Sequence, residues 1–346
     1  MPRDRDITPV PANEPIMHFA ARVDDAIHEF RERRARRRGH APTVIPYAGY
    51  GGPGWIRVLC RIVLQKAVTD DELSLNVRGW RNFMSVPLDD SAVTVDVAGV
   101  EHVVTADRGG IVDVRLDADL APGWQTVTLC TAGSETVEAP IYVVDTTAGF
   151  GVVSDIDDTV MVTSLPRPFL AAWNTFVVDE HARRPVPGMA VLYERLTREH
   201  PGAPVIYLST GAWNVAPALT RFLSRNLYPR GPLLLTDWGP THDRWFRSGT
   251  DHKRESLDRL AEEFPEVKWL LVGDDGQHDE ELYAEFSRAH PDKVRAVAIR
   301  QLSTSEAVLA GGRSKGEEHE RASGIPWVAA PDGAGLADRL RATGRV

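Results

Sequence analysis

The sequence predicts an α/β domain built on a Rossmann-like parallel sheet, preceded by an all-β, sandwich-like domain. Between residues 44 and 148 the apolar runs are short, rich in Val and Ile, and separated by Gly, Pro, Asp or Asn, as in β-sandwiches. From 149 to 330 continuous apolar runs alternate with helix-like stretches, which indicates parallel strands covered on both faces. Residues 331–346 are expected to form a C-terminal tail, with a short helix near 335–342.

The N-terminal segment, residues 1–43, combines a Pro-rich start that is expected to be disordered with an amphipathic helix over 14–38. One face of this helix carries apolar residues at helical spacing: Ile16, Phe19, Ala20, Val23, Ile27 and Phe30. A basic run from Arg31 to Arg38 follows, and such a helix can lie on an anionic membrane. Its polar face also carries acidic residues, which that membrane would repel, so docking onto the protein itself is the favoured alternative.

The bulk composition excludes several function classes. A formal net charge of −9 over 346 residues argues against a general nucleic-acid binder, which needs a basic surface. No apolar run approaches the ~20 residues that cross a bilayer, and the N-terminus lacks the apolar core of a signal peptide. The chain is therefore expected in the cytoplasm, with a peripheral position at the inner membrane face left open. In that compartment Cys60 and Cys130 are expected to be buried thiols rather than a disulfide.

Carboxylates follow the first strand of the α/β domain. The apolar run FGVVSD ends in Asp155, and Asp157 and Asp158 come next. In open parallel sheets the ligand site lies at the carboxyl ends of the strands. Acids clustered there need a compensating cation, and Mg²⁺ with oxygen ligands is the usual ion beside phosphates. The alternative is a helix N-terminus whose dipole stabilises these acids.

A second group of acids follows a later strand. The run WLLVGDDGQHDEELY places Asp274 and Asp275 at a strand end, with Asp279 five residues after Asp274. This pattern also suits a metal at the carboxyl edge of the sheet. A capped helix with Asp279 and Glu280 in its first turn is the alternative.

A hydroxyl group and a lysine complete the pattern. The run PVIYLS ends in Ser209, followed by Thr210 and Gly211, where a hydroxyl and backbone N–H groups can cradle a phosphate. Lys253 opens a predicted helix over 251–264, from which it can reach a phosphoryl oxygen. Taken singly, the first motif is more often a turn or cap, and such a lysine more often lies on the surface.

Taken together and in this order, the motifs DIDDT, YLS, HK and GDDGQHD resemble the haloacid dehalogenase superfamily of phosphatases. The pattern of that superfamily is DxDx[TV], a strand ending in Ser or Thr, a Lys, and GDxxxD or GDxxxxD. The resemblance implies a haloacid dehalogenase-like fold in which the first and fourth strands are neighbours. All four motifs would then meet at one switch point of the sheet.

A closer resemblance, over about residues 149–302, is to the actin-patch-associated phosphatidate phosphatases, which are related to the lipins. It is carried by DIDDTVMVTSLPRP, AAWNTFV, RRPVPGMAVLYERL, YLSTGAWN, LLLTDWGP, FRSGTDHK and VGDDGQHDEELY. It implies Mg²⁺-dependent hydrolysis of the phospholipid phosphatidate to diacylglycerol. A phosphatase for a soluble phosphomonoester is one alternative, because a fold does not fix a substrate. A non-catalytic phosphate- or lipid-binding module is another, which the intact acids and lysine disfavour.

The resemblance also implies a role for each motif residue. Asp155 would be the nucleophile that forms an aspartyl-phosphate, and Asp157 would protonate the leaving oxygen and later activate water. Ser209 would hydrogen-bond the phosphoryl group, with Thr210 as the fallback. Lys253 would neutralise the charge on the nucleophile and the phosphoryl group.

The same resemblance implies the ligands of Mg²⁺. Asp155, Asp274 and the backbone carbonyl of Asp157 would hold the ion, with Asp279 close by. Asp275 stands where the family often has Ser, so this extra acid would either join the metal site or face solvent.

The segment after the first strand carries several large apolar residues: Met161, Leu165, Phe169, Leu170, Trp173 and Phe176. The distance in sequence to Gly188 is too short for a large cap domain, so the site is expected to be open to a bulky or membrane-embedded substrate. The alternative is that these residues complete the core.

Overall fold

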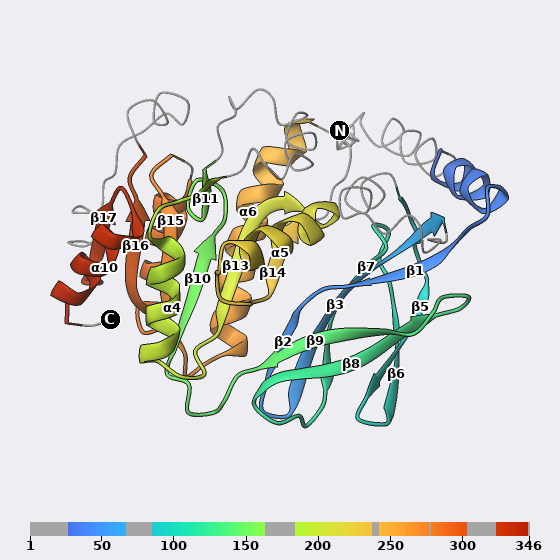
Figure 1. Cartoon of the computed structure of the whole chain (residues 1–346), viewed down its shortest axis with the longest axis horizontal. Helices are drawn as coiled ribbons and strands as arrows, with labels where there is room; N and C mark the ends of the chain where they lie inside the picture. Colours follow the sequence, from blue (N-terminus) through green and yellow to red (C-terminus); the bar gives the residue numbers. More distant parts are fainter. Residues whose placement is uncertain are drawn as a thin grey trace, which may run out of the picture.

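The computed structural model has a β part and an α/β part that lie side by side (Figure 1). It describes residues 27–66, 85–162, 184–236, 242–276, 278–302 and 323–344. No described helix is long and apolar enough to cross a membrane. Cys60 and Cys130 are free thiols, the first buried and the second half-buried.

Nine of the described strands belong to the β part and form one curled sheet (Figure 1). They are β1 His40–Pro46, β2 Gly49–Gly52, β3 Trp55–Lys66, β4 Val86–Pro87, β5 Ala92–Val97, β6 Val100–Thr105, β7 Ile111–Asp117, β8 Gly123–Thr131 and β9 Val137–Val143. Their order is β1-β3-β2-β9-β8-β5-β6, with β4 and β7 also paired to β3. Because β3 has partners on both edges and core on both faces, its apolar run is almost continuously buried. Val58, Leu129 and Ile141 are fully buried in a core that belongs to this part alone.

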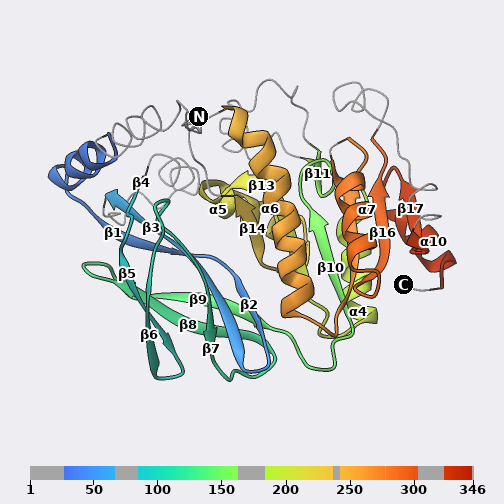
Figure 2. The same cartoon turned by 180° about the vertical axis from the view of Figure 1, so that it is seen from behind.

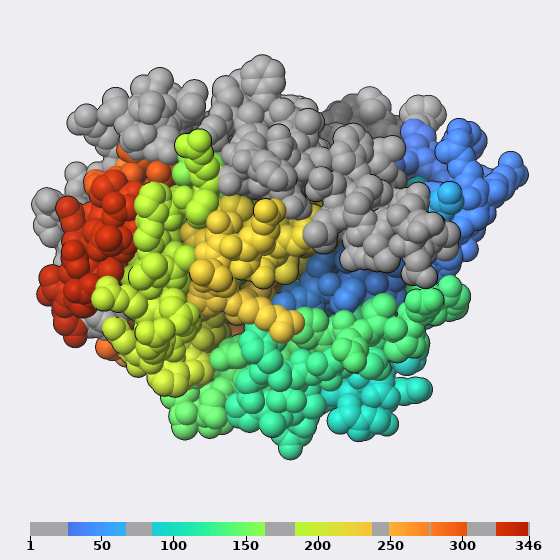
Figure 3. Space-filling view, in the orientation of Figure 1, coloured from blue at the N-terminus to red at the C-terminus, as the bar shows by residue number. Residues whose placement is uncertain are grey.

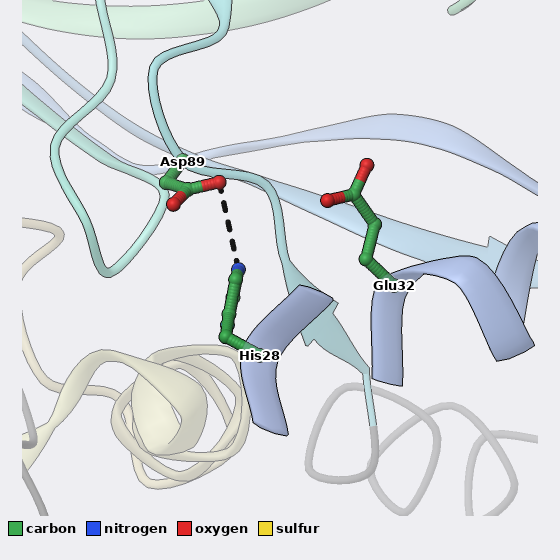
Figure 4. A group of neighbouring side chains, drawn as sticks. All are labelled: His28, Glu32 and Asp89. Carbon is green, nitrogen blue, oxygen red and sulfur yellow. Dashed lines mark ion pairs between the residues drawn. The ribbon is translucent and has the colours of Figure 1, made fainter. Parts of the chain in front are cut away.

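A helix over residues 27–37 precedes β1 and docks on the β part. Ala35 is buried in the core of that part, and His28 Nε2 lies 3.5 Å from a carboxylate oxygen of Asp89 (Figure 4). Gly39 follows the helix two residues after its end, and its φ of +76° is the left-handed conformation in which glycine often terminates helices. The rest of the helix predicted over 14–38 lies outside the described residues.

The α/β part is built on six described parallel strands in the order β14-β13-β10-β15-β16-β17. These strands are β10 Phe150–Asp155, β13 Val205–Ala212, β14 Leu233–Thr236, β15 Lys268–Asp274, β16 Val294–Arg300 and β17 Trp327–Ala330. The short strands β11 Met161–Val162 and β12 Arg184–Pro185 pair with each other. The predicted parallel sheet is therefore confirmed, and its continuous apolar runs are explained by burial on both faces.

The described helices cover both faces of this sheet. They are α4 Met189–Glu199, η3 Trp213–Val215, α5 Ala216–Arg225, α6 His242–Glu263, α7 Asp279–Ala289 and α10 Gly333–Ala342. Figure 1 shows α4, α5 and α10 in front of the strands, whereas α6 and α7 lie on the opposite face, which Figure 2 brings forward. The crossovers from the neighbouring strands β10 and β15 thus diverge, which creates a switch point at their carboxyl ends.

Two boundaries differ from the prediction. Helix α6 begins at His242 rather than at residue 251, so Lys253 lies in the middle of the helix. The short helix predicted near 335–342 is confirmed as α10, but the residues after 331 are not a free tail, because α10 packs against α4 and buries Leu336 and Leu340 in the core of the α/β part. A Cβ added at Gly333 would lie 2.2 Å from the carbonyl carbon of Gly188, so only glycine permits this approach.

Candidate active site

The loop after β10 is held in one conformation by backbone contacts. Asp158 has a φ of +57°, a left-handed conformation that Asp adopts more readily than most residues. Its N–H donates to the Met161 carbonyl at 2.8 Å, and its own carbonyl accepts from Arg300 Nη1 at 2.8 Å. The loop therefore fixes Asp157 beside Asp155, the last residue of β10, and both side chains are buried.

The second group of acids lies where β15 passes into α7. Asp274 ends β15, and its Oδ1 accepts the Gly276 N–H at 2.7 Å. Asp279 opens α7, where the helix dipole favours a carboxylate. A Cβ at Gly273 would lie 2.7 Å from Asp279 Oδ2, so the glycine leaves room for this carboxylate to approach the strand. Asp279 is therefore both an acid in the first turn of a helix and one of the acids of the candidate site, so the two interpretations of this motif are compatible.

Lys253 reaches both groups from α6. Its Nζ lies 2.7 Å from Asp155 Oδ1 and 2.7 Å from Asp279 Oδ1, and the side chain is buried. Burial alone would lower the pKa of this lysine, but the two carboxylates raise it above its ordinary value. Lys253 is therefore held as an ammonium ion between the end of β10 and the start of α7.

Ser209 lies at an irregular end of β13, where the register against β14 shifts between Leu208 and Ala212. Its Oγ donates to Asp157 Oδ2 at 3.0 Å and accepts the Gly211 N–H at 3.0 Å. Ser209 rather than Thr210 thus has its hydroxyl in contact with the acids.

The site carries more negative than positive charge. One oxygen each of Asp155, Asp274 and Asp279 lies within 4.8 Å of the others, and Lys253 is the cation bonded to this group. Burial and the neighbouring carboxylates raise the pKa of Asp155, whereas Lys253 lowers it. Burial, then Asp279 and Asp155, raise the pKa of Asp274.

The same group has the donors that a hard divalent cation requires. Asp155 Oδ2 and Asp279 Oδ2 are buried and have no hydrogen-bond partner among the described residues. Buried carboxylate oxygens normally have such partners, and oxygen donors are what hard divalent cations prefer. The residues present therefore fit a divalent cation.

All six residues predicted for the site lie around this one edge of the sheet: Asp155, Asp157, Ser209, Lys253, Asp274 and Asp279. Asp275 takes a different part, because its Oδ1 accepts the Leu302 N–H at 2.8 Å and thereby fixes the chain after β16. Arg300, which holds the Asp158 carbonyl, was not predicted, since a single Arg at the end of an apolar strand carries no sequence signal.

Of the apolar residues predicted to give access to a lipid, Met161 is fully buried, and the others lie outside the described residues. His28, Glu32 and Asp89 form a second group within 4.8 Å (Figure 4). These side chains are half-buried, and Glu32 Oε1 lies 2.9 Å from Arg36 Nε, so we interpret the group as the docking contact of the helix over 27–37.

Comparison with known proteins assigns the α/β part. Residues 150–301 match the family model described as the phosphatidate phosphatase APP1 catalytic domain. This stretch is similar to that family of catalytic domains. The chain is 26% identical over 254 residues to phosphatidate phosphatase APP1 of Saccharomyces cerevisiae, which covers 68% of this chain and 42% of the yeast protein. It is 24% identical over 155 residues to an uncharacterized protein of Schizosaccharomyces pombe, covering 44% of this chain and 25% of that protein.

The chain thus spans less than half the length of these two relatives. Among solved structures, the HAD domain of the effector Lem4 from Legionella pneumophila is 15% identical, with a TM-score of 0.30, and covers 50% of this chain and 93% of that domain. A carbohydrate acetylesterase from Xanthomonas citri is 12% identical, with a TM-score of 0.25, over 87% of this chain and 66% of the esterase. At these TM-scores neither structure informs the site.

Proposed function

We propose that this chain is a phosphoric monoester hydrolase that acts through an aspartyl-phosphate on Asp155. The observation that supports this most is the Lys253 ammonium bridging Asp155 and Asp279, beside the Ser209 to Asp157 hydrogen bond. A nucleophilic carboxylate, a second carboxylate two residues on, a hydroxyl and a cation are the groups that phosphoryl transfer requires.

The reaction proceeds in two steps. An Asp155 carboxylate oxygen attacks the phosphorus, the ester P–O bond breaks, and Asp157 gives its proton to the departing oxygen. Water then attacks the phosphorus of the aspartyl-phosphate and passes its proton to Asp157. The P–O bond to Asp155 breaks, and inorganic phosphate leaves.

Ser209 and Lys253 act by position and charge. The Ser209 hydroxyl, which donates to Asp157 in this structure, would turn its proton to a phosphoryl oxygen of the bound ester. The Lys253 ammonium faces the nucleophilic oxygen at 2.7 Å and offsets the negative charge that the phosphoryl group brings.

Mg²⁺ is the proposed cofactor. Asp155, Asp274 and the backbone carbonyl of Asp157 would hold it, with Asp279 at hand through the oxygen that Lys253 does not use. A bound Mg²⁺ supplies positive charge that stabilises phosphoryl oxygens. The support is the fit of the buried carboxylate oxygens to a hard cation.

Phosphatidate is the proposed substrate, and diacylglycerol and inorganic phosphate are the proposed products. The support is the match of residues 150–301 to the phosphatidate phosphatase APP1 catalytic domain and the likeness to the yeast protein of that name. Hydrolysis of a soluble phosphomonoester is the second candidate, because the chemistry at phosphorus is identical.

We further propose a cytoplasmic chain with peripheral contact to the inner membrane face. In the helix over 27–37 and the residue that follows it, Ile27, Phe30, Arg31, Arg34 and Arg38 are exposed, whereas Ala35 is buried. Ile27 and Phe30 are 53% and 61% exposed, and residues 27–38 contain six arginines and two glutamates. Apolar and basic side chains on one exposed face suit an anionic lipid surface.

Phosphate release tests the enzymatic proposal. The purified chain would be assayed with Mg²⁺ on phosphatidate in phosphatidylcholine vesicles, on glycerol 3-phosphate and on an aryl phosphate, with chelator and with Asp155→Asn as controls. Turnover of phosphatidate that chelator and Asp155→Asn abolish is the expected result. Turnover of soluble esters alone would favour the second substrate class. No turnover of any ester would instead favour a non-catalytic binding module.

Vesicle sedimentation tests the membrane proposal separately. Phe30→Ser should weaken binding to anionic vesicles and leave turnover of an aryl phosphate unchanged, because the helix lies at the end of the β part that is far from the α/β sheet (Figure 1). Equal sedimentation of this variant and the native chain would exclude the exposed face as the contact.

A further inference from the structure

The β part and the α/β part meet over a buried interface. Tyr50 and Trp55 of the β part pack against Phe264, with ring centroids 5.8 and 5.4 Å away, and Phe264 packs against Trp269 of β15. Residues of both parts therefore share one apolar core. In the space-filling view no gap separates the described residues of the two parts on the visible face (Figure 3).

Polar contacts fix the end of α6 at this interface. The Tyr50 hydroxyl donates to Glu263 Oε2 at 2.9 Å, and the Arg57 guanidinium donates to Glu263 Oε1. Asp113 accepts from Arg57 at 2.7 Å and from Arg259 at 2.8 Å. Glu263 is ten residues beyond Lys253, or about 15 Å along the helix axis.

A second contact reaches the chain immediately after the Ser209 loop. Tyr47, between β1 and β2, stacks on Trp213 with ring centroids 4.7 Å apart, and its hydroxyl donates to the Trp213 carbonyl at 3.1 Å. The Tyr47 N–H donates to the Leu59 carbonyl at 3.0 Å, so its backbone is fixed within the β part. Trp213 is two residues after Gly211, whose N–H donates to the Ser209 Oγ.

The loop between Ser209 and Trp213 needs such support because it lies in the irregular end of β13. From within the α/β part, Thr236 Oγ1 donates to the carbonyls of Thr210 and Gly211 at 2.9 and 3.2 Å. The Trp213 carbonyl is held from the other side by Tyr47. The backbone that presents the Ser209 hydroxyl is thus fixed by one residue from each part.

We propose that Tyr47 is a positioning residue for the phosphate-binding loop over 209–213, so that the β part completes the active site of the α/β part. This inference rests on the proposed function, since it assigns a phosphoryl group to that loop. Tyr47 does not touch the reacting atoms, and it acts through Trp213 and Gly211.

The test compares Tyr47→Phe with Tyr50→Phe in the full chain. Both variants keep the aromatic ring and lose one hydroxyl at the interface. The hydrogen bond that is lost measures 3.1 Å for Tyr47 and 2.9 Å for Tyr50. Only the first touches the loop. Three quantities would be measured: hydrogen exchange of the 205–215 backbone, kcat/KM for an aryl phosphate, and inhibition or binding by inorganic phosphate. Thermal unfolding of both variants would report on the interface in general.

Tyr47→Phe is expected to speed exchange at 211–215 and to weaken kcat/KM and phosphate binding, each by about three- to tenfold, the equilibrium factor of one hydrogen bond. Tyr50→Phe should leave all three unchanged. Equal effects of the two variants would mean a general loss of interface stability and would overturn the inference, as would no effect of Tyr47→Phe. Should the native chain hydrolyse no ester, the proposed function fails, and exchange together with phosphate binding still decides the role of Tyr47.

Discussion

Replacing Lys253 by Met separates the electrostatic role of this residue from its packing. Met keeps the length and the apolar stem, but the substitution removes an ammonium that lies 2.7 Å from both Asp155 and Asp279. Removing one partner of a buried ion pair destabilises a protein by about 3–5 kcal/mol, because the remaining charge has no compensation. We expect a loss of this size in the free energy of unfolding of the metal-free protein.

The same change should strengthen metal binding while it removes activity. Two unit charges about 4 Å apart interact by about 4 kcal/mol at an effective dielectric constant of about 20, so an ammonium beside the acids opposes any bound cation. A third of that interaction energy would already change the dissociation constant of Mg²⁺ tenfold. We therefore expect the Lys253→Met variant to bind Mg²⁺ at least about tenfold more tightly. Turnover should fall by about 10²–10³, as when one preorganised donor to the phosphoryl charge is lost.

Titration calorimetry and the Mg²⁺ dependence of the melting temperature measure the affinity, and phosphate release measures turnover. Lys268→Met, which changes an exposed lysine at the start of β15, is the matched control and should alter neither. If Lys253→Met kept native turnover, or bound Mg²⁺ more weakly than the native chain, the electrostatic reasoning would be refuted.

Three further predictions concern other residues. Asp155→Asn should abolish turnover of every ester. Asp157→Asn should slow hydrolysis of an alkyl phosphate by about 10²–10⁴ and of an aryl phosphate less, because the aryl group leaves without a proton. Equal losses of rate on the two substrates in both variants would contradict these roles. Burial lowers the pKa of His252 to about 4. The unfolded chain, with a His pKa of about 6.5, therefore takes up the proton first, and stability should fall by about 2 kcal/mol between pH 7 and pH 5 in urea unfolding. His252→Gln should lose that part of the pH dependence, and an unchanged slope would show that His252 is not buried neutral. Leu340→Ala should lower the free energy of unfolding by about 2–5 kcal/mol by opening a cavity, whereas a residue in a loose tail would tolerate the change within about 0.5 kcal/mol.

The sequence alone predicted the parallel sheet and the six candidate site residues because both depend on local patterns. A strand buried on both faces reads as a continuous apolar run, and the polar residue that ends the run marks the carboxyl edge of the sheet. Asp155, Asp274 and Ser209 are each placed in this way. That the motifs converge followed from the resemblance to the haloacid dehalogenase superfamily, in which the first and fourth strands are neighbours.

Only the tertiary structure decided how these residues contact one another and what surrounds them. The pairing of Lys253 with Asp155 joins residues 98 positions apart, and no local pattern encodes which acids a lysine in mid-helix will meet. Helix α10 belongs to the core because Gly188 and Gly333 allow close packing, although its short, charged sequence resembles a tail. The contact of Tyr47 with Trp213 depends on how the two sheets pack against each other, and that packing is set by complementary surfaces rather than by the periodicity of either segment.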